Sequence, residues 1–216
     1  MFSVLLDFNG TMFFDSSLHL QAWSEIYREL HPEDIDPPGA DRFCGPCNDA
    51  ILQKIAPQLT PEERIFYSEK KEALYRNACV ANPALFHLAP GTEAFLEHLQ
   101  RNGIPFGLAS ASIKANIDFF FDSFALGRWF RKEDVVYDDG TYPDKGAMHL
   151  EAARRLGVPL GRCLLVEDSL SSIRHAKQNG AGCIVAIGST AQPDVLLAAG
   201  ADHHIQDFTG FDLAWL

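Results

Sequence analysis

The chain places a carboxylate, Asp7, directly after the apolar run at residues 2–6. An apolar run that ends in an acid predicts a buried parallel strand, and ligands of open α/β sheets bind where such strands end. Gly10 follows closely and lets the backbone approach a ligand, because it has no side chain. Asp7 is therefore the first candidate for a residue that contacts a ligand.

Three later segments carry polar groups where further strands should end. The hydroxyls of Ser110 and Ser112 precede an expected helix, whose first N–H groups together with a hydroxyl suit an anion. Lys145 stands just before another helix, and Glu167 and Asp168 end a further strand. The sequence thus supplies hydroxyls, an ammonium group and a pair of carboxylates at one edge of the predicted sheet.

These groups have complementary roles around a phosphoryl group. A hard divalent cation such as Mg²⁺ binds one or two carboxylates together with substrate oxygens, and we expect Asp7 and Asp168 to supply those carboxylates. Lys145 and a hydroxyl would hold the remaining phosphoryl oxygens as charge develops on them. The pattern predicts Mg²⁺-assisted chemistry on a phosphorylated molecule.

Strand-like and helix-like segments alternate after residue 90, which predicts right-handed βαβ units and a parallel sheet. The expected strands are 2–6, 104–110, 135–137, 163–168, 182–187 and 203–206. The expected helices between them are 92–102, 113–121, 146–156, 169–179 and 194–199.

Residues 16–88 differ, because they contain helix-like segments and no strand-like run. The helical candidates are 18–30, 49–55 and 61–77. We therefore expect an α/β fold, with a doubly wound parallel, Rossmann-like core and an inserted all-helical cap. The core would span 1–14 and 90–216, and the cap 15–89.

The composition limits the classes of partner. The net charge of −11 argues against a nucleic-acid partner and against an anionic membrane surface. No apolar stretch approaches the roughly 20 residues that span a bilayer, and the N-terminus lacks the basic region of a signal peptide. The five cysteines are odd in number, and Cys163 and Cys183 fall in expected core strands, which favours reduced thiols. We expect a cytoplasmic monomer.

The order of these motifs resembles the haloacid dehalogenase-like superfamily over nearly the whole chain. Within it, the resemblance is to the β-phosphoglucomutase-like phosphatases, whose helical cap follows the first motif. The residues that carry the resemblance are Asp7-Phe8-Asn9-Gly10-Thr11, Asp15-Ser16, His19, Ala22-Trp23, Pro90-Gly91, Ser110, Lys145 and Glu167-Asp168-Ser169.

The resemblance implies a role for each site residue. Asp7 would attack phosphorus and become an aspartyl phosphate, while Ser110 and Lys145 bind the phosphoryl group of a small metabolite. The implied Mg²⁺ ligands are Asp7, Asn9 through its backbone carbonyl, Glu167 and Asp168. The residues expected to bind substrate are Gly10, Thr11, His19, Asn48, Ala111 and Ser112. The cap would close over the substrate and exclude water.

Asn9 is the main departure from the family motif, which places an aspartate there. In these phosphatases that side chain protonates the leaving oxygen and then activates water, and an amide cannot titrate. Such proton transfer is worth ~10²–10⁴-fold, so attack by Asp7 could survive its loss. Three explanations stay open. The leaving group needs little protonation, as in an acyl phosphate or a phosphonate; another group such as His19 supplies the proton; or the protein acts by binding.

Two further departures bear on the substrate. Lys145 follows Pro143-Asp144 instead of opening the usual Lys-Pro-x-Pro-Asp motif. Asn48 stands where sugar-phosphate mutases place a phosphate-binding arginine, which argues against a mutase.

Other functions stay open as alternatives. A dehalogenase would use Asp7 against carbon without a metal, which the acidic pair at 167–168 argues against. A phosphonate hydrolase would need a cap lysine to form a Schiff base, and Lys54 is the obvious candidate. The Cys-Gly-Pro-Cys run at 44–47 matches the thioredoxin tetrapeptide, but it follows a loop-like segment instead of a strand.

Overall fold

The computed structural model describes residues 2–34, 43, 47–188 and 191–216. The chain divides into two compact units. Met1–Phe14 and His87–Leu216 form the larger unit, and Asp15–Phe86 forms the smaller one. The predicted division into a core and an inserted cap places the second boundary a few residues later, at 89–90.

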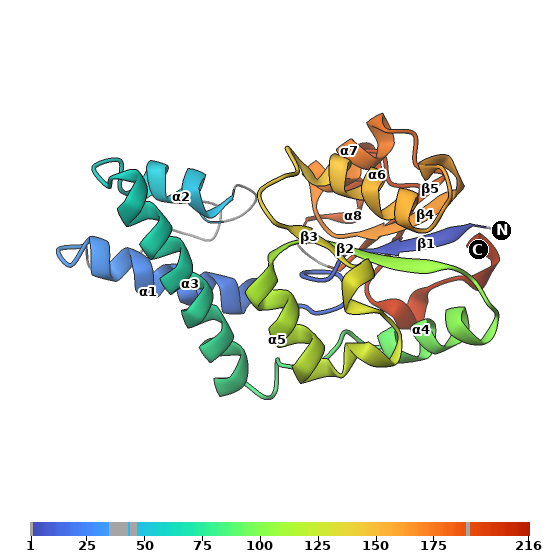
Figure 1. The fold of residues 1–216 in the computed structure, drawn as a ribbon, viewed down its shortest axis with the longest axis horizontal. Helices are drawn as coiled ribbons and strands as arrows, with labels where there is room; N and C mark the ends of the chain where they lie inside the picture. The colour runs from blue at the N-terminus through green and yellow to red at the C-terminus, as the bar shows by residue number, and fades with distance from the viewer. Residues whose placement is uncertain (1, 35–42, 44–46, 189–190) are drawn as a thin grey trace. The chain divides into compact units, whose positions relative to one another are not determined.

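The larger unit is built around a six-stranded sheet with the strand order β3-β2-β1-β4-β5-β6 (Figure 1). All neighbouring strands are parallel. The strands are β1 (Ser3–Leu6), β2 (Phe106–Ile113), β3 (Val136–Asp138), β4 (Cys163–Glu167), β5 (Cys183–Ile187) and β6 (His203–Ile205). This is the strand order of a doubly wound nucleotide-binding sheet, and it confirms the predicted fold class.

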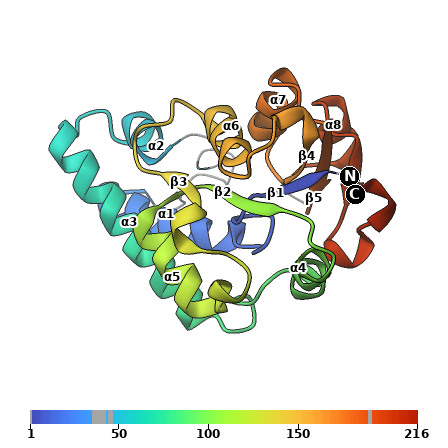
Figure 2. The ribbon, with the colours of Figure 1, turned by 45° about the vertical axis from the view of Figure 1, so that its right-hand side comes forward.

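Helices cover both faces of this sheet. In Figures 1 and 2, α6 to α8 lie on one face and α4 and α5 on the other. The bounds are α4 (Thr92–Arg101), α5 (Lys114–Phe124), α6 (Lys145–Arg155), α7 (Leu170–Gln178) and α8 (Pro193–Ala198). Because every residue of β1, β4 and β5 is buried, these central strands read as nearly continuous apolar runs.

The smaller unit is helical in the part of it that the structure describes. It contains α1 (Ser16–Leu30), α2 (Asn48–Ile55) and α3 (Pro61–Ala81). Thr60 and Glu63 form the capping box that their spacing predicts at the start of α3. The helices pack around Trp23, Ile26, Tyr27, Phe43, Ile51, Leu52, Ile55 and Ala56.

The structure corrects two predicted boundaries near the site. β2 does not end at Ser110, because it pairs with β3 as far as Ile113, across a shift in register after Ser110. Lys145 does not precede α6 but is its first residue, because the Asp144 side chain caps the helix by accepting from the Ala147 backbone N–H.

None of the helices in the described ranges combines the length and the apolar character needed to cross a bilayer.

Candidate active site

Register brings the polar residues of three adjacent strands to one edge of the sheet. Leu6 pairs with Val166, so Asp7 and Glu167 come next on β1 and β4. The Asp7 backbone N–H donates to the Val166 carbonyl at 3.1 Å. Ser110 lies near the carboxyl end of β2, which flanks β1 on its other side. The predicted convergence of Asp7, Ser110 and Glu167 therefore follows from strand order alone.

A tight loop after β1 fixes the direction of Asp7. The Gly10 backbone N–H donates to the Phe13 carbonyl at 2.7 Å, and the Phe8 carbonyl accepts from Met12 at 2.8 Å. Gly10 has φ +71°, and a Cβ there would collide with the Asp168 carboxylate. Only glycine therefore allows the loop and the second acid to lie this close.

Aromatic side chains of α5 pack against the same loop. The Phe8 and Phe120 rings stack with centroids 4.3 Å apart, and Phe13 lies 5.2 Å from Phe124. Phe8, Phe13 and Phe120 are fully buried. Because Phe120 and Phe124 belong to α5, these rings anchor the turn to that helix.

Lys145 reaches Asp7 across 138 residues of sequence. Its Nζ lies 2.6 Å from Asp7 Oδ1 and 3.6 Å from Glu167 Oε1. The side chains of Asp7 and Lys145 are each about one-tenth exposed. The structure thus places Lys145 against the predicted nucleophile although its motif departs from the family pattern.

His149 supports Glu167 from behind. Its Nε2 lies 2.6 Å from Glu167 Oε1, and the histidine is 1% exposed. His149 stands one helical turn after Lys145, so both reach Glu167 from the same face of α6. Sequence analysis did not identify His149, although its spacing of four from the lysine was a usable signal.

Burial and charge shape the protonation of the two acids in opposite directions. Burial raises the pKa of Asp7 to about 7, with Lys145 pulling it down and Glu167 pushing it up. Burial would also raise the pKa of Glu167, but the Lys145 charge and the His149 hydrogen bond hold it below its usual range. Asp7 is therefore the group whose ionisation changes near neutral pH.

The carboxylates are arranged to suit a cation. Asp7, Glu167 and Asp168 each bring an oxygen within 4.8 Å of the others. Among the described residues, the buried Oε2 of Glu167 finds no hydrogen-bond partner. An all-oxygen donor set with an orphaned buried oxygen fits a hard divalent ion.

Asn9 lies among hydroxyls. Its Oδ1 accepts from Ser112 Oγ at 2.6 Å and from Ser110 Oγ at 3.4 Å. The Ser112 backbone N–H donates to Ser110 Oγ at 3.2 Å. Ala111 between them is exposed. Thr11, for which substrate binding stays a prediction, is fully buried, and its hydroxyl finds no partner among the described residues.

The smaller unit holds its own buried polar cluster, which contains His19. His19 Nδ1 accepts from Lys71 Nζ at 2.8 Å, and Nε2 lies 3.2 Å from Asp15 Oδ2. The His19 ring stacks on Tyr75 with centroids 3.9 Å apart. Lys71 is 2% exposed, and burial lowers its pKa although Glu72 beside it opposes the shift. A buried lysine here was not predicted, because helical spacing alone favours an apolar residue.

Asn48, the other predicted contact in the cap, is bound within the same unit. Its Nδ2 donates to Ser68 Oγ at 3.0 Å and to Glu72 Oε1 at 2.7 Å. Lys54 is exposed on α2. Of the Cys-Gly-Pro-Cys run, 44–46 lie outside the described residues, and Cys47 is an exposed free thiol.

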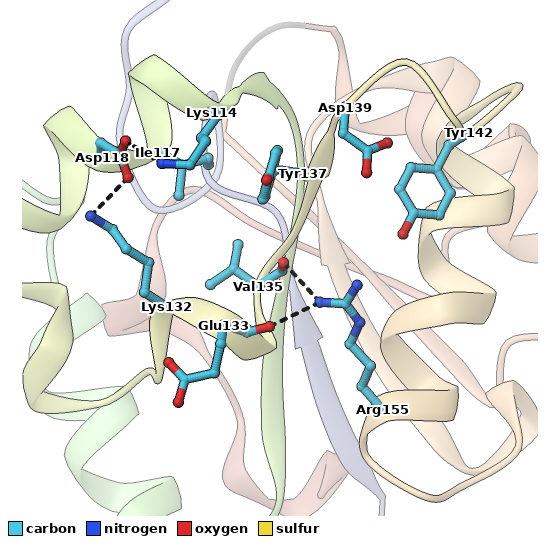
Figure 3. Close-up of a pocket in the computed structure, with 10 residues that line it drawn as sticks. All are labelled: Lys114, Ile117, Asp118, Lys132, Glu133, Val135, Tyr137, Asp139, Tyr142 and Arg155. Carbon is cyan, nitrogen blue, oxygen red and sulfur yellow. Dashed lines mark hydrogen bonds and ion pairs between the residues drawn. The ribbon is translucent and has the colours of Figure 1, made fainter.

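A pocket of about 450 Å³ lies elsewhere on the larger unit, between α5, β3 and α6 (Figure 3). Lys132 pairs with Asp118 at 2.8 Å, and Arg155 donates to the carbonyls of Glu133 and Val135. The charged side chains that line it are thus engaged by ion pairs or by hydrogen bonds with neighbouring residues. It includes none of the Asp7 cluster, so we assign the chemistry to the sheet edge.

With this geometry in place, comparison with known proteins identifies the family. The profile described as haloacid dehalogenase-like hydrolase matches residues 4–186. The chain belongs to this family.

Curated relatives include proteins named YhcW and CbbY. YhcW of Bacillus subtilis, named as a phosphatase, is 28% identical over 127 residues, which are 59% of this chain and 57% of YhcW. A plasmid-encoded CbbY of Cupriavidus necator matches over 40% of its length, so the chain spans about half the length of these first curated relatives. CbbY of Cereibacter sphaeroides is 25% identical over 228 residues, 95% of this chain and 92% of that protein.

Solved structures of haloacid dehalogenase-like hydrolases share the fold across the whole chain. A family IA variant 3 hydrolase from Entamoeba histolytica has a TM-score of 0.90 at 28% identity and covers 99% of this chain and 96% of its own. A CbbY mutant from Rhodobacter sphaeroides, in complex with xylulose-(1,5)bisphosphate, has a TM-score of 0.80 at 21% identity, with 99% and 98% covered. The β-phosphoglucomutase of Clostridium difficile has a TM-score of 0.77 at 20% identity, with 100% and 95% covered. The family predicted from the motifs is confirmed.

Proposed function

We propose that this protein is a Mg²⁺-dependent phosphatase-type hydrolase that attacks a small phosphorylated metabolite with Asp7. The observation that carries the proposal is the position of Asp7, with Lys145 at 2.6 Å and two further carboxylates close by. Such a site combines a nucleophile, a fixed cation and a donor set for a metal. The intermediate would be an aspartyl phosphate on Asp7.

Each residue has a defined task in this proposal. Asp7 attacks phosphorus only in its ionised form, so the proton that burial retains there must leave first. Lys145 and Ser110 neutralise and bind the phosphoryl oxygens as their charge develops. Asp7, Asp168, Glu167 and the backbone carbonyl of Asn9 would hold Mg²⁺. The ion, when bound, supplies positive charge against the phosphoryl oxygens.

Several comparisons support a phosphorylated substrate. Relatives include a protein named as a phosphatase and a CbbY structure in complex with phosphate. A Deinococcus radiodurans family member was solved with bound phosphate and sodium. These printed names and complexes belong to those proteins, and we carry over only the class, a phosphate compound.

The cap residues favour hydrolysis over a mutase reaction. A sugar-phosphate mutase needs a clamp for a second phosphate, and Asn48 gives its amide hydrogens to Ser68 and Glu72. Lys54, the expected Schiff-base lysine of a phosphonate hydrolase, is exposed on α2. We therefore keep a phosphatase-type hydrolase as the conclusion.

The experiment is a phosphatase screen with and without Mg²⁺ on the wild-type protein and Asp7→Asn. Asp138→Asn is the matched control, because Asp138 also ends a strand of this sheet, β3, but lies outside the carboxylate cluster. We expect Mg²⁺-dependent turnover that Asp7→Asn abolishes and Asp138→Asn keeps. Mass spectrometry after acetyl phosphate treatment should locate the phosphoryl group on Asp7. A protein that binds Mg²⁺ and phosphate, yet neither turns over nor labels Asp7, would be a binding homologue instead.

A further inference from the structure

The side chain of Asn9 brings no acid to the reaction centre. Its Oδ1 is the acceptor for Ser112 Oγ at 2.6 Å and for Ser110 Oγ at 3.4 Å. Both serine protons are therefore directed at the amide oxygen. A primary amide and two alcohols are all very weak acids at neutral pH, so this corner of the site cannot protonate a departing alkoxide.

The two stronger acids nearby are each paired with a carboxylate of the site. Lys145 Nζ is held between Asp7 Oδ1 at 2.6 Å and Glu167 Oε1 at 3.6 Å. His149 is 1% exposed and meets Glu167 through Nε2, so Glu167 stands between it and the site. Among the described residues of the larger unit, no group around Asp7 is left to act as a general acid.

His19, the alternative acid suggested by the sequence, is engaged within the smaller unit. Its Nδ1 accepts from Lys71 Nζ, which places the ring proton on Nε2. That nitrogen faces the Asp15 carboxylate at 3.2 Å, and the ring is stacked on Tyr75. Releasing a proton elsewhere would require His19 to break its contact with a buried carboxylate.

We propose that the substrate of this site is an acyl phosphate, whose leaving group departs as a carboxylate and needs no proton. The inference rests on the proposed function and deepens it. A carboxylic acid has a pKa of about 4, whereas an alkoxide leaving group resembles hydroxide, whose conjugate acid, water, has a pKa far above the physiological range. A site in which the described residues around Asp7 supply no acid accepts the first leaving group and discriminates strongly against the second.

The steps balance without an acid. An Asp7 carboxylate oxygen forms a bond to phosphorus, the bond from phosphorus to the acyl oxygen breaks, and its electron pair leaves with the carboxylate. Water then attacks phosphorus, and the Asp7–phosphorus bond breaks to restore the aspartate. The water proton remains on the product as dihydrogen phosphate. Because Asn9 also cannot act as a base in this second step, the aspartyl phosphate should be long-lived.

The test is the dependence of kcat/KM on the leaving group, with Mg²⁺ present. The series is acetyl phosphate, para-nitrophenyl phosphate, phenyl phosphate and glycerol phosphate, in order of increasing leaving-group pKa. We compare the wild-type protein with Asn9→Asp, and use Asn102→Asp as the matched control, because Asn102 is exposed at the end of α4 and adds the same charge away from the site.

We expect the wild-type kcat/KM to fall steeply along the series. The ratio of Asn9→Asp to wild type should rise by ~10²–10⁴ between acetyl phosphate and glycerol phosphate, the usual range for general acid catalysis. Asn102→Asp should follow the wild-type slope. The wild-type slope decides the question alone if Asn9→Asp fails to fold.

Two results distinguish a failure of the acyl phosphate assignment from a failure of the proposed phosphatase-type function. If the wild-type protein cleaves glycerol phosphate within tenfold of acetyl phosphate, a general acid is present and the acyl phosphate assignment is overturned while hydrolysis by Asp7 stands. If no compound in the series turns over and acetyl phosphate leaves Asp7 unlabelled, the proposed function itself falls.

Discussion

Lowering the pH should weaken Mg²⁺ binding far earlier than an ordinary aspartate would require. In the metal-free protein, burial raises the pKa of Asp7 from its ordinary 3.8 to about 7. That difference of about 3 pH units corresponds to roughly 4 kcal/mol between the two protonation states. A metal binds the deprotonated carboxylate, so binding must displace the proton.

The expected dependence is simple. Above about pH 7 the apparent Mg²⁺ affinity should be nearly constant, and below it the affinity should fall about tenfold per pH unit. An unperturbed aspartate would hold the affinity constant down to about pH 4. At pH 6, the two cases therefore differ by roughly tenfold, which calorimetry resolves. Titrations in two buffers of different ionisation enthalpy should also show the released proton.

Lys145→Met provides the companion measurement. Because the Lys145 charge lowers the pKa of Asp7, its removal should move the break in affinity to higher pH. At alkaline pH the same variant should bind Mg²⁺ more tightly, since the ammonium group at 2.6 Å from Asp7 repels a second cation. An affinity that stays flat between pH 8 and pH 5.5 in the wild-type protein would refute the reasoning.

Three further predictions concern stability and the loop. Asp7 keeps its proton to a higher pH in the folded chain than in the unfolded one, so the free energy of unfolding of the metal-free protein should fall as pH rises from about 4 to about 7. Asp7→Asn should flatten this pH dependence in urea unfolding. A variant whose stability falls as steeply with pH as that of the wild type would contradict the prediction. Gly10→Ala should lower the free energy of unfolding by more than the ~1–2 kcal/mol that a left-handed φ costs an alanine, and it should weaken Mg²⁺ binding, because the new Cβ meets Asp168. Gly157→Ala is the control: Gly157 has φ +73° and open space around its Cβ position, so this variant should show the cost of φ alone. His149→Leu should lower the free energy of unfolding by about 1.5–3 kcal/mol, because Glu167 Oε1 loses its short hydrogen bond to His149. His149→Gln, which keeps a donor, should recover part of this loss. Equal losses in both variants would point to packing instead.

The sequence predicted the parts of the site that depend on strand ends. An apolar run followed by an acid places Asp7 and Glu167 side by side once β1 and β4 are neighbours in a parallel sheet. The comparisons confirm the family and the fold. The residue roles inferred from the resemblance stay predictions for the experiments above.

Other features of the site could not be predicted from the sequence. They depend on the rotational phase of a helix or on contacts between residues far apart in the sequence. His149 faces Glu167 because of the helical phase of α6, which the Asp144 cap sets by starting the helix at Lys145. The sequence pattern instead predicts a start at residue 146. The extension of β2 beyond Ser110 depends on pairing with β3, which no local pattern reveals. Lys71 contacts His19 and Trp23 of α1 as well as two residues of α3. Because half of these contacts come from another helix, the sequence of α3 alone does not predict that Lys71 is buried.

The central position of β1 has a consequence for how the chain is made. Val4 pairs with Phe106 on one side and with Leu164 on the other. Synthesis of the roughly 160 residues between the first strand and its second partner takes on the order of 10 s. During that interval an apolar strand has unpaired edges, which are templates for association with other chains. The helical insertion separates Asp7 in sequence from every other strand that contributes to the candidate site. That site is therefore assembled late, and errors in folding should appear first as aggregation through the N-terminal strand.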